Sequence, residues 1–175
     1  MPNHSELSTE SASYSNKFNL SIAELVEMAK KLRRHVITMI AMAGSGHPGG
    51  SLSAADIITA LYFKILRHNP KNPQWLERDR FILSKGHAAP ILYAALAEAG
   101  YFPVAELATL RKLDSRLQGH TDRNFTPGVE MSAGSLGMGL SFAIGVALAG
   151  RLNSQGYRTY VLLGDGECDE GQVWE

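Results

Sequence analysis

The chain has 175 residues, enough for one globular domain. Seventeen basic and seventeen acidic residues cancel without forming a block of like charge, which argues against nucleic acid or a membrane surface as a partner. A single cysteine, Cys168, cannot form an internal disulfide, so the composition indicates a reducing, cytoplasmic compartment and excludes a disulfide-stabilised secreted scaffold.

The first part of the chain predicts a tail followed by helices. Residues 1–18 are serine-rich and lack an apolar stretch, which predicts a disordered tail rather than a signal peptide. Apolar residues then recur every three or four positions from 22 to 40, as in a long amphipathic helix. Asn19 or Ser21 would cap its start, and Gly44 would end it. A second helix is predicted over 53–65, opened by a capping box of Ser53 and Asp56.

The rest of the chain alternates between predicted strands and helices. Strands are expected at 80–84 and 159–163. Helices are expected at 90–99, from Pro103 to Lys112, and at 137–150, and the last of these is expected to be buried. The stretch Asp114–Ala133 has no period and is a candidate functional loop. This order predicts an α/β fold with a parallel sheet flanked by helices over residues 19–175. Two strands do not make a stable sheet, so the domain is expected to be incomplete at its C-terminus.

Three of the six histidines directly follow a glycine: His47, His87 and His120. Glycine lets the backbone approach a ligand closely, and histidine exchanges protons near neutral pH. These residues are either turn histidines with structural hydrogen bonds or members of one functional site. A three-histidine zinc site stays open, because the spacings neither support nor exclude it.

Two glycine-rich segments stand at the ends of predicted elements. The run G-S-L-G-M-G at 134–139 precedes a helix, so its N–H groups face an anion or a polar ring, or else serve close helix packing. The second strand runs into G-D-G-E-C-D-E-G, where Asp165 offers oxygen ligands to Mg²⁺ or Ca²⁺ and the glycines admit a phosphate. Glu167 and Asp169 are interpreted as acids at a solvated helix start, and Cys168 as a small filler.

Six motifs in this order resemble the N-terminal, thiamine-diphosphate-binding half of the transketolases, or a split N-terminal subunit of that family. They are S-G-H-P-G-G, D-R-F-I-L-S-K-G-H-A, L-Q-G-H, P-G-V-E, G-S-L-G-M-G and G-D-G-E-C-D-E-G, and the resemblance runs from about residue 21 to the last. It implies transfer of a two-carbon ketol unit from a ketose phosphate to an aldose phosphate, as in the pentose phosphate pathway. Thiamine diphosphate would act as the electron sink, with Mg²⁺ (or Ca²⁺).

The resemblance also implies roles for individual residues by motif position. His47 and His120 would be catalytic residues that contact substrate, and Asp165 would bind the metal. Asp79 and Arg80, within a matching motif, are interpreted as structural. Glu170 resembles a buried acid that communicates between the two sites of a dimer. The expected cofactor-binding residues are His87, Gly134, Ser135, Leu136, Gly166 and Glu170.

Several family features lie outside this sequence or differ in it. The family's second metal-ligand asparagine lies beyond the last residue, and the glutamate that activates the aminopyrimidine belongs to a second domain. Met138 and Thr121 replace an expected glutamine and proline, which leaves the donor substrate open. The chain is therefore expected to need a C-terminal domain or subunit, as a homodimer or heterotetramer, and to be inactive alone. The alternatives are a three-histidine zinc hydrolase and a non-catalytic interaction module.

Overall fold

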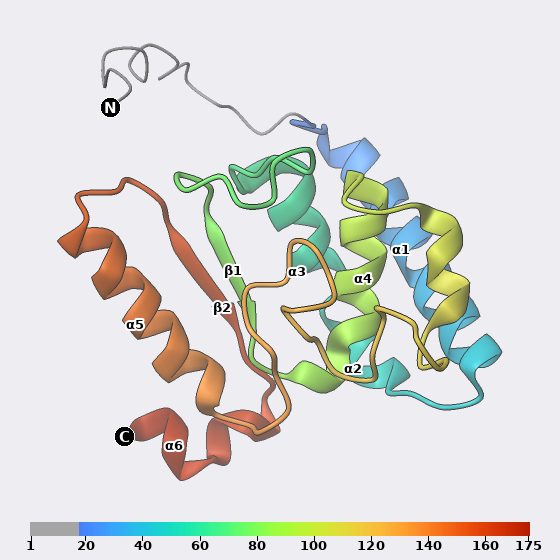
Figure 1. Ribbon diagram of the computed structural model, residues 1–175. Helices are drawn as coiled ribbons and strands as arrows, with labels where there is room; N and C mark the ends of the chain where they lie inside the picture. Colours follow the sequence, from blue (N-terminus) through green and yellow to red (C-terminus); the bar gives the residue numbers. More distant parts are fainter. Residues whose placement is uncertain (1–17) are drawn as a thin grey trace, which may run out of the picture.

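The computed structural model describes residues 18–175, so the predicted tail lies outside the described residues apart from Phe18. The ring of Phe18 packs edge-on against Phe63, with the two centroids 5.1 Å apart. The sheet consists of two parallel strands, β1 (Arg80–Leu83) and β2 (Thr159–Leu162), paired in register. Helix α5 lies on one side of the sheet, and α1, α3 and α4 form a layer on the other (Figure 1). This arrangement confirms the predicted α/β fold. The helices are α1 (Ile22–Ala43), α2 (Pro48–Ser53), α3 (Ala55–Ala60), α4 (Ala89–Ala99), α5 (Met138–Leu152) and α6 (Gly171–Trp174).

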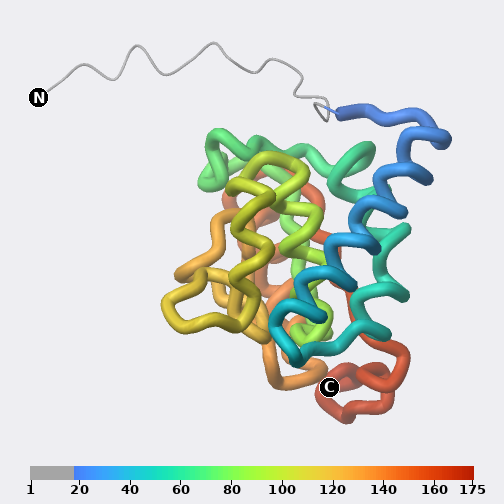
Figure 2. The backbone as a smooth tube through the Cα atoms, turned by 90° about the vertical axis from the view of Figure 1, so that its right-hand side faces the viewer, coloured from blue at the N-terminus to red at the C-terminus, as the bar shows by residue number. Residues whose placement is uncertain are grey.

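Helix α1 has the capped start and the apolar face that the sequence predicts. Ser21 and Glu24 form a capping box, in which the Ser21 N–H donates to Glu24 Oε2 over 2.8 Å. The helix ends at Gly44, whose φ of +67° suits glycine. Its apolar face packs against α3 and α4, and α1 runs beside the helices that follow it (Figure 2). The buried residues of this face are Ala29, Leu32, Val36 and Met39.

The predicted second helix, at 53–65, is wrong in its start and in its capping. The chain becomes helical at Pro48, because proline is preorganised for the first helical position. Ser53 instead ends α2, and its hydroxyl donates to the Gly50 carbonyl. Asp56 does not cap, because its carboxylate pairs with both terminal nitrogens of Arg33 on α1, at 3.0 and 2.6 Å. After α3, a π-helical turn, Leu61–Ile65, completes the segment.

Two further helices differ from the prediction. The helix expected from Pro103 to Lys112 is a 3-10 helix, η3 (Val104–Thr109), followed by a left-handed residue, Arg111, with φ of +60°. Helix α5 is not a buried helix, since Ile144 is 53% and Leu148 51% exposed. The sheet covers only one face of α5, and the buried residues of this helix are Gly139, Ala143 and Gly150. No helix among the described residues is long and apolar enough to cross a membrane.

Asp79 and Arg80 are structural, as interpreted from the sequence. The Asp79 carboxylate accepts hydrogen bonds from the backbone N–H of Arg67 at 2.9 Å and of Arg158 at 2.8 Å. The Arg80 guanidinium donates to the carbonyls of Arg78 and Leu76. These bonds fix the amino ends of both strands together, so the carboxyl ends also lie side by side.

Candidate functional site

The carboxyl ends of β1 and β2 meet at one edge of the sheet. The Ser84 N–H donates to the Leu162 carbonyl over 3.0 Å, which extends the strand pairing by one step. The chain then turns away on both strands, through Lys85 after β1 and through Gly164 and Asp165 after β2. Ligands of open α/β sheets bind at such carboxyl ends. Chemistry-bearing residues 80 positions apart in the sequence are therefore neighbours.

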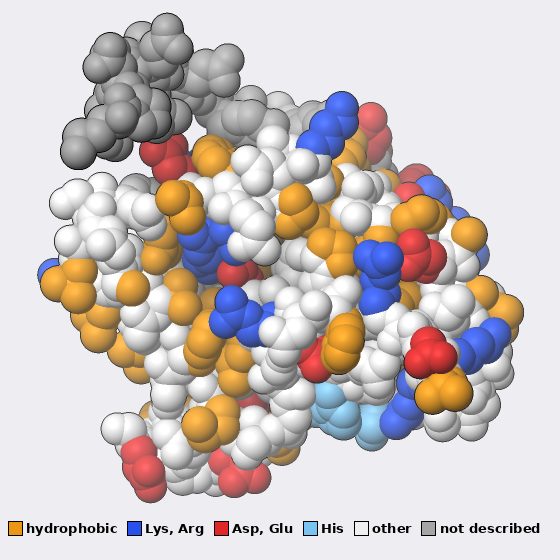
Figure 3. Space-filling view, viewed as in Figure 1, with side chains coloured by type: hydrophobic (Ala, Val, Ile, Leu, Met, Phe, Trp, Pro, Cys, Tyr) orange, Lys and Arg blue, Asp and Glu red, His pale blue; other side chains and the backbone are white. Residues whose placement is uncertain are grey.

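The three glycine-linked histidines come together at this edge. The ring centroid of His47 lies 5.4 Å from that of His87 and 6.4 Å from that of His120. Histidine side chains gather at the lower edge of the molecule in Figure 3. A Cβ on Gly50 would lie 2.9 Å from the His87 ring, so any larger residue at this position would displace that ring. The three residues therefore form one cluster rather than three separate turns.

The environment of two of these histidines favours their neutral form. Partial burial, and then the positive forms of His47 and Lys85, lower the pKa of His87 from its usual value. Partial burial, followed by His47 and Arg111, lowers the pKa of His120 in the same way. Since an ordinary histidine has a pKa of about 6.5, both rings are neutral at pH 7 and able to accept a proton.

We expect the rings of His87 and His120 to titrate with midpoints below those in the urea-unfolded chain, measured by NMR of the ring protons. Because the folded pKa is lower, the folded state is destabilised as pH falls through about 6.5, where the unfolded chain binds the protons first. In His47→Ala, both midpoints are expected to rise, because a neighbouring positive charge is removed. Midpoints at or above the unfolded values would contradict this account.

A cavity of about 450 Å³ lies beside His87, between α2 and the turn that follows β2. Asp165 and Gly166 are exposed at its rim, while Lys85 is 7% exposed and donates to Ser53 Oγ over 3.2 Å. The cavity therefore brings together a cation, a carboxylate and glycine backbone. Its lining residues are Gly49, Gly50, Ser53, Lys85, His87, Leu136, Gly164, Asp165, Gly166 and Glu167.

The other predicted site residues lie around this cavity or further away. Gly134 and Ser135 are exposed and lead into Leu136, which lines it. His120 lines a neighbouring cavity of about 530 Å³. Glu170 is exposed in this chain, at the start of α6, and not buried as the resemblance implied. A buried position for Glu170 thus requires a covering surface from elsewhere.

Glu167 is the residue lining this cavity whose environment sequence reasoning misjudged. It is 3% exposed, and not an acid at a solvated helix start. Its carboxylate accepts hydrogen bonds from the Ser84 hydroxyl at 2.5 Å, from Gly137 N–H at 2.9 Å and from Gly164 N–H at 2.8 Å. Two of these donors are 83 and 30 residues away, so local sequence carries no sign of them. Asp169, by contrast, is exposed as interpreted.

The histidine cluster does not form a zinc site. Within residues 18–175, no three side chains of His, Cys, Asp or Glu converge closely enough to hold a metal ion. Zinc enzymes bind their metal through three protein ligands. The zinc hydrolase alternative therefore has no geometric basis in the described residues.

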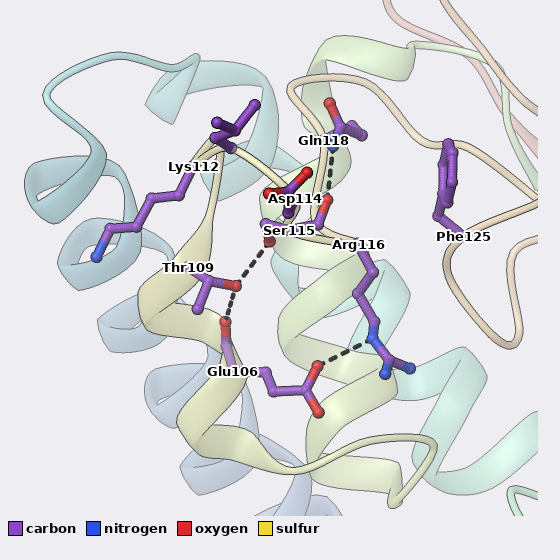
Figure 4. Close-up of a pocket in the computed structure, with 9 residues that line it drawn as sticks. Glu106, Thr109, Lys112, Asp114, Ser115, Arg116, Gln118 and Phe125 are labelled. Atoms are coloured by element: carbon purple, nitrogen blue, oxygen red, sulfur yellow. Dashed lines mark hydrogen bonds and ion pairs between the residues drawn. The ribbon is translucent and has the colours of Figure 1, made fainter.

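A further cavity, of about 770 Å³, lies between η3 and the start of the predicted functional loop (Figure 4). Four of its polar side chains are bonded in pairs: Arg116 pairs with Glu106 at 3.0 Å, and the Thr109 hydroxyl contacts that of Ser115 at 2.7 Å. Gln118 lines both this cavity and the one beside His120. The loop therefore borders both cavities.

Comparison with known proteins gives consistent matches along the described chain. Residues 25–175 match the family described as "Transketolase, thiamine diphosphate binding domain". The 6-deoxy-6-sulfo-D-fructose transketolase subunit SqwG of Clostridium sp. (strain MSTE9) is 47% identical over 152 residues, which cover 87% of this chain and 55% of the relative. One subunit of the apulose-4-phosphate transketolase of Actinobacillus succinogenes is 45% identical over 161 residues, 91% of this chain and 58% of the relative.

Solved structures give the same result. The transketolase of Campylobacter jejuni superposes with a TM-score of 0.83 at 38% identity, over 89% of this chain and 26% of that structure. The transketolase of Leishmania mexicana has a TM-score of 0.81 at 34% identity, over 86% of this chain and 24% of that structure. The chain thus spans a little over half the length of the subunit relatives and about a quarter of these solved chains.

Proposed function

This chain belongs to the transketolase family, as its thiamine diphosphate-binding domain, and from that premise we propose that it serves the transfer of a two-carbon ketol unit from a ketose phosphate to an aldose phosphate. Mg²⁺, or Ca²⁺ in its place, would join the cofactor to the protein. The observation that supports this proposal is the gathering of His47, His87 and His120 beside a cavity with Asp165 on its rim.

The residues of the cavity fit a metal-bound diphosphate. Asp165 offers the hard oxygen that Mg²⁺ prefers, and Gly166 exposes backbone beside it. Lys85, itself buried, adds a positive charge to the lining of the cavity. Gly49 and Gly50, on α2, add no side chains to the cavity. At about 450 Å³, the space is also within the range of cofactor sites.

Each side chain of the cluster would have a distinct task. When bound, thiamine diphosphate supplies a carbanion and an electron sink for breaking and forming the carbon–carbon bond. His87, on the wall of the cavity, would lie beside the diphosphate and hold a proton near it. His47 and His120 would hold substrate hydroxyls and exchange protons with them. Gly134, Ser135 and Leu136 would line the pyrimidine end.

The proposal includes a second protein component. The subunit relatives are themselves named as subunits, which supports a C-terminal domain or subunit that completes the enzyme. Glu170 is exposed in this chain, and we expect that component to cover it. A second copy of this chain, in a homodimer or heterotetramer, could cover it instead. A cytoplasmic location in sugar-phosphate metabolism, such as the pentose phosphate pathway, follows from the same proposal.

We expect the 175-residue chain alone to lack ketol transfer and to bind the cofactor weakly, because the second metal ligand and the activating glutamate that the family resemblance implies are not among its residues. Transfer from a ketose phosphate is measured with the chain alone and with a complementing C-terminal domain or subunit. Activity only in the mixture supports the proposal. Full activity of the chain alone would refute the need for a partner, and a mixture that binds cofactor without transfer would indicate a non-catalytic module.

A further inference from the structure

The Glu167 carboxylate joins three separate segments of the site. Its Oε1 accepts from the Ser84 hydroxyl, just after β1, and from the Gly137 N–H, just before α5. Its Oε2 accepts from the Gly164 N–H, in the turn after β2. The Ser84 oxygen in turn accepts from the Gly139 N–H in the first turn of α5, over 3.2 Å. One side chain therefore holds together both strand ends and a helix start.

From this network we infer that Glu167 is a positioning residue, which holds the turn of Asp165 and Gly166 in register with the segment 134–137. The inference rests on the proposed function, in which that turn would bind the metal and that segment would line the far end of the cofactor. By fixing the two against each other, Glu167 sets the distance between the two ends of the cofactor site.

A carboxyl group suits this position by its hydrogen-bond geometry. Each of its oxygens faces only donors: a hydroxyl and an N–H at Oε1, and an N–H at Oε2. A glutamine amide would turn its NH₂ group toward at least one of these donors and leave that N–H without an acceptor. A buried carboxyl group is costly unless hydrogen bonds satisfy it, and these three donors meet that need for Glu167.

The start of α5 depends on the same network. Its N-cap is Gly137, in a left-handed conformation with φ of +81°, which has no side chain to bind the first N–H groups. Ser84 and Glu167 provide hydrogen-bond acceptors from outside the helix. An acidic side chain such as Glu167 is also favoured at the N-terminus of a helix, where the helix dipole is positive. The position of α5 is thereby linked to that of the turn after β2.

The test is the affinity for Mg²⁺ in the presence of saturating thiamine diphosphate, measured by calorimetry on the assembly of this chain with its C-terminal component. In Glu167→Gln we expect this affinity to fall about 10- to 100-fold, the usual effect of losing a partner that orients a metal ligand. The matched control is Asp169→Asn, which removes the same charge from an exposed side chain in the same turn, and it should stay within about twofold of wild type.

Equal affinities in Glu167→Gln and Asp169→Asn would overturn the inference. If Glu167→Gln does not fold, Ser84→Ala takes its place, since it removes the hydroxyl that joins Glu167 to α5. A reduced Mg²⁺ affinity of Ser84→Ala supports the inference, and a wild-type affinity refutes it. Failure of the wild-type assembly to bind Mg²⁺ and thiamine diphosphate would instead refute the proposed function, so the two failures are distinguishable.

Discussion

Replacing Asp165 with alanine is expected to lower the affinity for Mg²⁺ and thiamine diphosphate about 100-fold or more, and to abolish ketol transfer by the assembled enzyme. Removing a partner that only orients a metal ligand typically lowers metal affinity about 10- to 100-fold, so removing the ligand itself is expected to reach at least the upper end of that range. Asp165 is the carboxylate on the rim of the cavity, so its loss removes the metal's anchor. Calorimetry and transfer assays measure the two effects.

The fold of Asp165→Ala is expected to be intact. The residue is exposed, and exposed substitutions usually change the free energy of unfolding by less than about 0.5 kcal/mol. Urea unfolding of the variant should therefore match the wild type, which separates lost binding from lost structure. Asp169→Ala is the control, because it removes another exposed acid four residues further on. Wild-type cofactor affinity in Asp165→Ala would contradict the assignment of this residue to the metal.

Replacing Gly139 with alanine is expected to destabilise the fold by about 1–3 kcal/mol, the usual cost of overpacking a core. Gly139 is buried where α5 meets the end of β1, and an added Cβ would lie 2.7 Å from the Ser84 Cα. That contact is with backbone, so α5 must move away from the strand. The same movement would pull Ser84 away from Glu167, and we expect cofactor affinity to fall as well.

Gly145→Ala provides the matched control, because an added Cβ at this position of the same helix meets nothing within 4 Å. Alanine is the better helix former, so this variant should be more stable than wild type by about 0.5–1 kcal/mol. The free energies of unfolding are compared by urea titration. A Gly139→Ala protein as stable as Gly145→Ala would show that α5 does not pack tightly on β1.

The sequence predicted those parts of the fold that depend on local patterns. The apolar period of α1, the cap at Ser21 and the stop at Gly44 all act within a few residues, and each is confirmed. Both strands are also confirmed, within one residue at their ends. The capping box of Ser53 and Asp56 failed because Arg33, 23 residues away, pairs with the acid. A local motif is therefore reliable only where no distant partner competes for it.

The same division holds for the site. The sequence by itself identified three glycine-linked histidines, a glycine-rich segment and an acidic turn as candidate site residues, because each of these motifs can be recognised from neighbouring residues alone. Their convergence was decided by the tertiary structure, since parallel strands bring their carboxyl ends to one edge whatever the distance along the chain. Glu167 is the clearest case: its neighbours in sequence are those of a solvated acid, and only the folded chain supplies the three donors that make a buried carboxylate stable.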